Sequence, residues 1–489
     1  MTERYDLAVI GAGAGGLSVT AVAARLGLRV ALIERGTMGG DCLNTGCVPS
    51  KALLAAAHLA EAARGAGRFG IDLPAPAIGW AGVRAHVRGV IADIAPADSA
   101  ARYRALGADV IAGSARFLDP ATLAINDPLA INDPLAVNDP LAAEDRRILA
   151  RRIVIAAGSR PVVPPIPGLD QVAFLTNETL FDLAEPPAHL LILGGGPVGL
   201  EMADAHAGLG CAVTLVEAGR IAGKEDPELA AGLRAALAAR GIAILEGVAV
   251  AAVEPGPTLV LADGRRIAGS HLLVAAGRRA DVESLALEAG GVRASAAGIA
   301  TDRGLRSLTN RRVFAVGDIA DPAGIGPRAF THAASHHAGI VIRRALFRLP
   351  ARLSDAALPR VTYTNPELAQ VGLTEAEARA AGHAPQVLRW PLAETDRARA
   401  EREPAGLVKL VVARGRVLGA GILAPHAGEM IGTWTLAIAR RVPLGALAGM
   451  IVPYPTRAEA AVRAAGSFYL ERLFAPRTRR LAALLARLP

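Results

Sequence analysis

Two stretches of the chain share one order of apolar and polar positions. In the first, the apolar run Tyr5–Ile10 precedes a glycine-rich turn, an Ala- and Leu-rich segment that ends at Leu26, and a second apolar run, Arg29–Ile33. Short apolar runs with β-branched residues predict buried strands, whereas the longer Ala/Leu segment predicts a helix. We therefore expect a strand, a helix and a second strand in a βαβ unit.

The same order returns later, with apolar runs at Leu190–Leu193 and Ala212–Val216. Each copy carries Gly-x-Gly-x-x-Gly in its turn and an acid after its second run, and the two copies have identical internal spacing. The residues are Gly11, Gly13, Gly16 and Glu34 in the first copy and Gly194, Gly196, Gly199 and Glu217 in the second.

Glycines of this spacing allow a tight turn and the close approach of a pyrophosphate to a helix N-terminus, and the acid accepts a hydrogen bond from a ribose hydroxyl. One such motif is weak evidence in a chain with 53 glycines, but two at matched spacing predict two dinucleotide sites. Because Glu217 would repel a 2′-phosphate, the second site favours NADH over NADPH. Arg220, three residues on, leaves NADPH possible.

Three further apolar runs end in turn residues and are expected to be strands that lead into a nucleotide site: Arg152–Ser159, His271–Gly277 and Val313–Asp318. The carboxylate of Asp318 can accept hydrogen bonds from sugar or ribityl hydroxyls. From about Arg360 the elements become shorter, which predicts a third, α+β domain. A low-complexity Asn-Asp-Pro repeat over residues 125–142 is expected to be a surface loop, because its prolines exclude a central strand.

Composition narrows the classes of protein. Of 489 residues, 52% are hydrophobic and three are cysteine, and the net charge is +8. This excludes a disordered chain and a disulfide-stapled secreted fold. With 3% aromatic residues and no basic run interleaved with aromatics, we expect no nucleic-acid partner. No apolar run reaches the ~18–20 residues that span a bilayer, so we expect a soluble cytoplasmic protein.

Two of the three cysteines, Cys42 and Cys47, lie five residues apart just after the first nucleotide motif, and Lys51 follows. They can be small buried apolar residues or half of a zinc site, but no second Cys/His pair with ligand spacing accompanies them. A redox dithiol is favoured, because a cation lowers the pKa of a nearby thiol and Lys51 is one of three lysines in the chain. Cys211 opens an apolar strand and is expected to be an inert core residue.

These motifs, with Gly317-Asp318 downstream, follow the order found in class I pyridine nucleotide-disulfide oxidoreductases, the family of lipoamide dehydrogenase, glutathione reductase and mercuric reductase. The chain resembles that family over about residues 4–465. The resemblance implies FAD at the first site and NAD(P)H at the second. It implies that Cys47 faces the flavin, that Cys42 exchanges with the electron acceptor, and that Lys51 pairs with Glu201.

The resemblance also assigns the remaining site residues, and it includes no metal site. The FAD-binding residues are Gly11, Gly13, Gly16, Glu34, Lys51, Gly113, Gly158, Asp318, Thr331 and His332. The NAD-binding residues are Gly194, Gly196, Gly199, Glu201, Glu217 and Gly277.

The resemblance further implies a homodimer with two Rossmann-like α/β domains and a C-terminal α+β dimerisation domain. We expect the first part of the FAD domain at 1–150, the NAD(P) domain at 151–280, the second part of the FAD domain at 281–345, the dimerisation domain at 346–466 and a basic tail at 467–489.

The chain departs from lipoamide dehydrogenase near its C-terminus. There the family carries a His-Pro and a Glu that act as a base from the partner subunit. Here Tyr454 replaces the His, while Pro455 and Glu459 match. The reference pKa of tyrosine is about 10, against about 6.5 for histidine, so Tyr454 is a poor base at neutral pH. Tyr454 and Glu459 complete the catalytic candidates.

A Tyr at this position resembles mercuric reductase, although the C-terminal cysteine pair of that enzyme is missing, since no cysteine follows Cys211. We therefore predict an FAD-dependent NAD(P)H oxidoreductase that passes electrons through Cys47 and Cys42 to a disulfide, a thiol-reactive oxidant or a soft metal ion. Alternatives are dihydrolipoyl dehydrogenase and an NADH:quinone or diaphorase flavoenzyme whose disulfide is structural. The basic tail can be a membrane-surface helix, but a helix docked on its own protein is favoured, so no membrane partner is expected.

Overall fold

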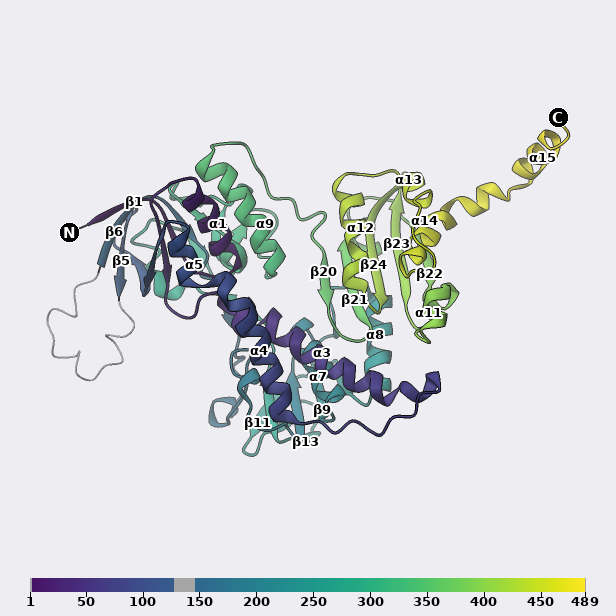
Figure 1. Ribbon diagram of the computed structural model, residues 1–489, viewed down its shortest axis with the longest axis horizontal. Coiled ribbons are helices and arrows are strands. Elements are labelled where there is room, and N and C mark those ends of the chain that lie inside the picture. The colour runs from purple at the N-terminus through teal and green to yellow at the C-terminus, as the bar shows by residue number, and fades with distance from the viewer. Residues whose placement is uncertain (1, 127–145, 489) are drawn as a thin grey trace.

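The computed structural model describes residues 2–126 and 146–488. Figure 1 shows the chain as two α/β bodies beside a smaller α+β body, with the C-terminal helix α15 extending from the last of these. Most of the Asn-Asp-Pro repeat that we expected to be a surface loop lies outside the described residues.

The first body is a mixed sheet of order β3-β2-β1-β6-β5-β4, with β18 added beside β6. Its strands are β1 (Glu3–Ile10), β2 (Val30–Glu34), β3 (Ala108–Ala112), β4 (Ser114–Phe117), β5 (Thr122–Asn126), β6 (Arg146–Ile155) and β18 (Val313–Ala315). The three strands β2, β1 and β6 run parallel, so that their carboxyl ends meet at one edge of the sheet. Helices α1 (Ala14–Arg25) and α9 (Thr331–Val341) pack against each other on this body.

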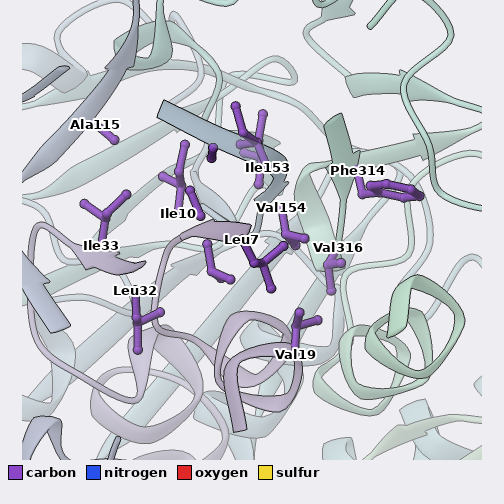
Figure 2. Packing of buried hydrophobic residues seen from close by; sticks show 14 of the residues in the cluster. Leu7, Ile10, Val19, Leu32, Ile33, Ala115, Ile153, Val154, Phe314 and Val316 are labelled. Carbon is purple, nitrogen blue, oxygen red and sulfur yellow. The ribbon is translucent and has the colours of Figure 1, made fainter. Parts of the chain in front are cut away.

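The central strands of this sheet are apolar along their length because both faces are covered. Figure 2 shows Leu7, Leu32 and Val154 on the side of the sheet nearer Val19 of helix α1, whereas Ile153 lies on the other side, and all five are fully buried. This packing holds the strand ends, and the turns that follow them, in fixed positions.

The second body is a parallel sheet of order β10-β9-β8-β14, joined by an antiparallel meander of three strands. Its elements are β8 (His189–Leu193), α7 (Pro197–Gly208), β9 (Ala212–Glu217), α8 (Pro227–Ala239), β10 (Ala243–Glu246), β11 (Val250–Glu254), β12 (Thr258–Leu261), β13 (Arg266–Ala268) and β14 (His271–Val274). The short antiparallel pair β7 (Ser159–Pro161) and β15 (Arg278–Ala280) lies where the chain passes between the two bodies.

The third body is an antiparallel sheet of order β20-β21-β24-β23-β22 with helices on it. Its elements are β20 (Arg360–Thr362), β21 (Glu367–Gly372), α10 (Glu375–Ala380), β22 (Gln386–Pro391), α11 (Asp396–Ala400), β23 (Leu407–Ala413), β24 (Arg416–Ala424), α12 (Ala427–Ala439), α13 (Leu444–Ala448), α14 (Ala458–Leu473) and α15 (Pro476–Leu485). Antiparallel order in this part agrees with the predicted α+β domain.

The remaining helices and strands connect these bodies. They are α2 (Gly40–Asn44), α3 (Cys47–Arg64), α4 (Trp80–Asp98), α5 (Ala100–Ala105), β16 (Ala294–Ser295), β17 (Gly298–Thr301) and β19 (Ala320–Pro322). Helix α3 leaves the first body and packs along α7 of the second, so a residue at the start of α3 faces both (Figure 1).

Three expectations need correction. The predicted boundary between residues 150 and 151 falls inside strand β6, which pairs with β5 and extends the first sheet to Ile155. The predicted strand Val313–Asp318 ends at Ala315, and Asp318 follows in a short 3₁₀ turn. Helix α15 has no buried residue, so the tail that we expected to dock on its own protein does not dock on the described residues of its own chain.

Candidate active site

The two cysteines stand on adjacent helices at the junction of the first two bodies. Cys42 lies in α2, and Cys47 is the first residue of α3. Pro49 occupies the first turn of α3, where its missing N–H has no partner in the helix. Both cysteines are free thiols, with Cys47 exposed and Cys42 half-buried. The Cys47 Sγ lies 3.3 Å from the hydroxyl of Thr331, the first residue of α9.

The surroundings of the two sulfur atoms push their pKa values apart. A hydrogen bond donated by the Cys42 thiol, a second one from Thr331 and the charge of Lys51 together lower the pKa of Cys47 to about 6. Donation to Cys47 and burial raise the pKa of Cys42. At neutral pH the reduced pair therefore holds one proton, on Cys42, and Cys47 is a thiolate.

Lys51 and Glu201 form an ion pair beside these sulfur atoms, as the resemblance implied. The Lys51 Nζ lies 2.7 Å from Glu201 Oε2, and the Glu201 carboxylate is almost fully buried. The other oxygen of Glu201 accepts a hydrogen bond of 3.1 Å from the backbone N–H of Tyr363. The Tyr363 ring lies 4.5 Å from the Lys51 ammonium, which adds a cation–π contact. Three segments far apart in the sequence thus hold the Lys51 charge near Cys47.

The first glycine turn is built so that other residues do not fit. Gly11 has φ +100°, and a Cβ at Gly16 would lie 1.9 Å from the carbonyl oxygen of Gly11. A Cβ at Gly13 would meet only the Cα of Gly40, at 4.0 Å, which leaves room for a ligand above the turn. The carboxylate of Glu34 accepts hydrogen bonds from the backbone N–H groups of Ala12 (2.6 Å) and Gly36 (2.8 Å). This cradle fits a pyrophosphate and a ribose.

The second turn repeats this geometry. Gly194 has φ +115°, and a Cβ at Gly199 would lie 2.0 Å from the Gly194 carbonyl oxygen. Space at Gly196 is open. The Glu217 carboxylate accepts 2.7 Å hydrogen bonds from the backbone N–H groups of Gly195 and Gly219. The sequence repeat therefore corresponds to two copies of one binding geometry.

The other predicted residues lie around the same opening. Gly113, Gly158 and Gly277 adopt positive φ angles that favour glycine. Burial raises the pKa of Asp318, whose carboxylate accepts a 2.6 Å hydrogen bond from the Ser159 hydroxyl. His332 also lines the cleft, and its Nε2 lies 2.9 Å from the carbonyl oxygen of Pro359.

Arg278 and Asn177 were missed by the sequence analysis. The Arg278 guanidinium contacts Ser159 and Asn177 and lies 3.0 Å from the Asp41 carboxylate, next to Cys42. Asn177 donates to Asp41 and to the carbonyl oxygen of Thr45. Together they fasten the cysteine loop to the second body. The available signal was the position of Arg278 directly after Gly277.

A single cleft of 2880 Å³ joins these features. Its lining includes both cysteines, Lys51, Glu34, Glu217, Asp318 and the open glycines of both turns. Pockets for one drug-sized ligand are about 300–1,000 Å³, so this cleft has room for two dinucleotides. Both cysteines line the same cleft as the two glycine turns, so the reactive ends of two dinucleotides bound there could reach them.

Tyr454 and Glu459 stand apart from this cleft within the described part of a single chain. Tyr454 is 71% exposed, and its hydroxyl donates a 2.9 Å hydrogen bond to Asp396. Glu459 pairs with Arg463 at 2.8 Å. A role for either residue at the cysteines therefore requires a second subunit, as the resemblance implied.

The comparison with known families agrees with this geometry. A family model described as pyridine nucleotide-disulphide oxidoreductase matches residues 5–339. A model of the dimerisation domain of the same proteins matches residues 358–465. The chain belongs to this family. It is a flavoprotein oxidoreductase of mixed α/β fold whose cofactors are FAD and NAD(P)H, and its dimerisation domain supports a homodimer.

Its relatives include two kinds of enzyme. The oxidoreductase is 39% identical to a mercuric reductase of Streptomyces lividans over 95% of this chain and 96% of that protein. It is 30% identical to a dihydrolipoyl dehydrogenase of Bacillus subtilis over 95% of this chain and 98% of that protein.

Solved structures show the same fold. The HOCl-induced flavoprotein disulfide reductase RclA of Escherichia coli, in a Cu(II) complex, matches with a TM-score of 0.81 at 26% identity, over 96% of this chain and 100% of that one. LpdA of Mycobacterium tuberculosis matches with a TM-score of 0.83 at 25% identity, again over 96% and 100%.

Proposed function

We propose that this oxidoreductase uses NADH to reduce a soft metal ion such as Hg(II), which the sulfur atoms of Cys42 and Cys47 bind. The observation that carries the proposal is that the Cys42 and Cys47 sulfur atoms are free and line one cleft, in surroundings that push their pKa values apart. Cys47 is a thiolate at neutral pH, whereas the pKa of Cys42 is raised and Tyr454 is a poor base. The 39% identity to a mercuric reductase supports the same choice.

A soft cation and a disulfide make different demands on Cys42. Thiolate attack on a disulfide needs Cys42 to lose its proton first. A thiophilic metal ion displaces that proton as it binds, because metal binding to sulfur is coupled to proton release. The site as built therefore favours the metal ion. With Hg(II), the balance is NADH plus Hg(II) giving NAD⁺, one proton and Hg(0).

We assign the chain's residues as follows. When bound, FAD supplies two-electron exchange between the nicotinamide and the sulfur centre. The turn at Gly11–Gly16, with Glu34 and Asp318, would hold FAD, and the turn at Gly194–Gly199, with Glu217, would hold NADH. Lys51, fixed by Glu201, keeps a positive charge beside Cys47 and favours its thiolate.

The domain division remains a proposal as well. Since β6 completes the first sheet, we place the first boundary after Ile155 instead of Ala150. A cytoplasmic location stays a prediction of the sequence. None of the helices in residues 2–126 and 146–488 is long and apolar enough to cross a membrane.

The acceptor proposal is tested by comparing two steady-state reactions. Purified enzyme is expected to oxidise NADH with Hg(II) at a rate at least about 100-fold above its oxidation of dihydrolipoamide by NAD⁺, because a general base contributes about 10²–10⁴-fold. Tyr454→His should raise dihydrolipoamide oxidation, and the matched Tyr454→Phe variant should not. Fast wild-type oxidation of dihydrolipoamide that Tyr454→Phe abolishes would instead identify a lipoamide dehydrogenase.

Glu217 is expected to set the choice of nicotinamide cofactor. Because its carboxylate is held by two backbone N–H groups where a ribose would lie, a 2′-phosphate meets a fixed negative charge. We expect kcat/KM for NADH to exceed that for NADPH by more than about tenfold, and Glu217→Ala to narrow the ratio. Glu254→Ala, at the end of β11 and outside the cleft lining, is the matched control. An unchanged ratio in Glu217→Ala would remove Glu217 from this role.

A further inference from the structure

The C-terminal helix α15 lies outside the two matched family domains. None of the described residues covers it. The dimerisation model ends at residue 465, and α15 follows at Pro476–Leu485. It has no buried residue, and Figure 1 shows it extending away from the third body at the end marked C. A helix of this length with an uncovered apolar side requires a partner to be stable in water.

The apolar side of α15 is a stripe of exposed leucines. Leu481, Leu484 and Leu485 are 55%, 61% and 53% exposed, and their spacing of three and four residues places them on one side of the helix. At 100° per residue, Arg479 falls on the opposite side, whereas Arg480 lies about 40° from Leu484 and Arg477 about 40° from Leu481. The leucine stripe is thus bordered by arginines, whose long side chains can extend past it.

The charge of the tail has one sign. It carries Arg472, Arg477, Arg479, Arg480 and Arg487, and no Asp or Glu follows Glu471. Among the described residues, none of these five arginines forms an ion pair. The whole chain has a net charge of +8, so a second copy of the chain repels the tail at long range.

We propose that the tail docks in the surface of an anionic lipid bilayer. A helix with an exposed leucine stripe bordered by arginines lies in the interfacial plane, with its leucines in the acyl boundary and its arginine side chains extended to the lipid phosphates. Such a helix lies on the membrane without crossing it. The described residues leave the leucine stripe uncovered and the arginines without ion pairs. An anionic bilayer surface supplies acyl chains for the leucines and phosphates for the arginines.

The test is co-sedimentation of the full-length holoenzyme with vesicles. Vesicles of phosphatidylcholine with about 30% phosphatidylglycerol should bind the enzyme, and pure phosphatidylcholine vesicles should bind it at least about tenfold more weakly. Arg479→Gln with Arg480→Gln should weaken binding to anionic vesicles on the order of tenfold, since each arginine near such a surface contributes several-fold. Added salt should weaken the wild type likewise.

A control variant distinguishes binding by the tail itself from attraction by the net charge of the whole chain. Arg311 and Arg312 are adjacent, exposed arginines on the first body, and Arg311→Gln with Arg312→Gln removes the same charge elsewhere. This control should bind like the wild type. Leu481→Ser with Leu485→Ser should abolish binding although it leaves the charge unchanged.

Three results would overturn the proposal. One is equal binding of the wild type and a chain that ends at Ala475. Another is equal loss in the two arginine pairs, which would mean that net charge alone attracts the vesicles. The third is conversion of a dimer into monomers when the tail is removed, measured by light scattering without lipid, which would mean that the partner subunit covers the leucines.

Discussion

Replacing Cys42 with serine is expected to lower NADH-dependent reduction of Hg(II) by about 10³-fold or more, while NADH still bleaches the absorbance of the bound flavin. The acceptor loses one of its two sulfur ligands, whereas the sulfur atom of Cys47 stays 3.3 Å from Thr331. Loss of a group that binds the reacting atom commonly costs several orders of magnitude in turnover. Steady-state NADH oxidation and anaerobic flavin absorbance measure the two halves of the prediction separately.

Cys47→Ser separates the two cysteines. In Cys42→Ser the remaining Cys47 thiolate should give a long-wavelength charge-transfer band with the flavin, whereas Cys47→Ser should give none even after NADH is added. Cys211→Ser is the control, since Cys211 is half-buried and burial raises its pKa to about 11, which keeps it a thiol. If turnover with the physiological acceptor survives Cys42→Ser, the disulfide is structural and the quinone-reductase alternative holds.

The parts of the site that the sequence revealed are those that depend on local backbone geometry. Gly11 and Gly16 could be recognised because Gly11 has φ +100° and a Cβ at Gly16 would lie 1.9 Å from the carbonyl oxygen of Gly11. Glu34 and Glu217 could be recognised because each lies at the end of a strand at a fixed distance from its turn. Such constraints act within about 25 residues, so they fix the spacing of the glycines and the acid along the sequence, and that spacing can be recognised.

The parts that the sequence did not reveal are contacts between distant segments. Arg278 reaches Asp41 from the other side of the β7–β15 pair, and Tyr363 reaches Lys51 from the third body. No periodicity in a single chain encodes such a contact, because it arises only when three sheets have been placed against one another. Tyr363 was also hidden by its surroundings in the sequence, since it lies between Thr362 and Thr364 and belongs to no motif.

The boundary inside β6 and the placement of the tail were missed for related reasons. Strand β6 begins before Ala150 because β5 pairs with its first half, and a strand edge created by pairing is not visible in the apolar run alone. The tail was expected to dock on its own chain because amphipathic helices usually do, but docking also needs a complementary surface. The leucines and arginines of α15 predict that the helix has a partner, but they do not identify that partner.

Replacing Lys51 with methionine is expected to raise the pKa of Cys47 and, because a smaller fraction of Cys47 is then thiolate, to slow turnover at neutral pH by about twofold. Removal of the cation makes the thiolate less favourable, so the half-point of Cys47 titration moves up from about 6. The hydrogen bond from Cys42 is the largest cause of the lowered pKa and remains, so the move is on the order of one pH unit. The rate of Cys47 alkylation by iodoacetamide, followed by peptide mass spectrometry across about pH 4 to 9, reports it.

The sign of the effect separates this role from a structural one. Since the thiolate is restored when the pH exceeds the raised pKa, alkylation of Cys47 in Lys51→Met should approach the wild-type rate at high pH. Lys409→Met is the matched control, because Lys409 is a buried lysine paired with Asp226 at 2.8 Å, away from the cleft. Its loss leaves a buried carboxylate unpaired and should lower the Tm, but the alkylation profile of Cys47 should not move. Equal profiles in Lys51→Met and the wild type would show that Lys51 acts on turnover by another route than the charge of Cys47.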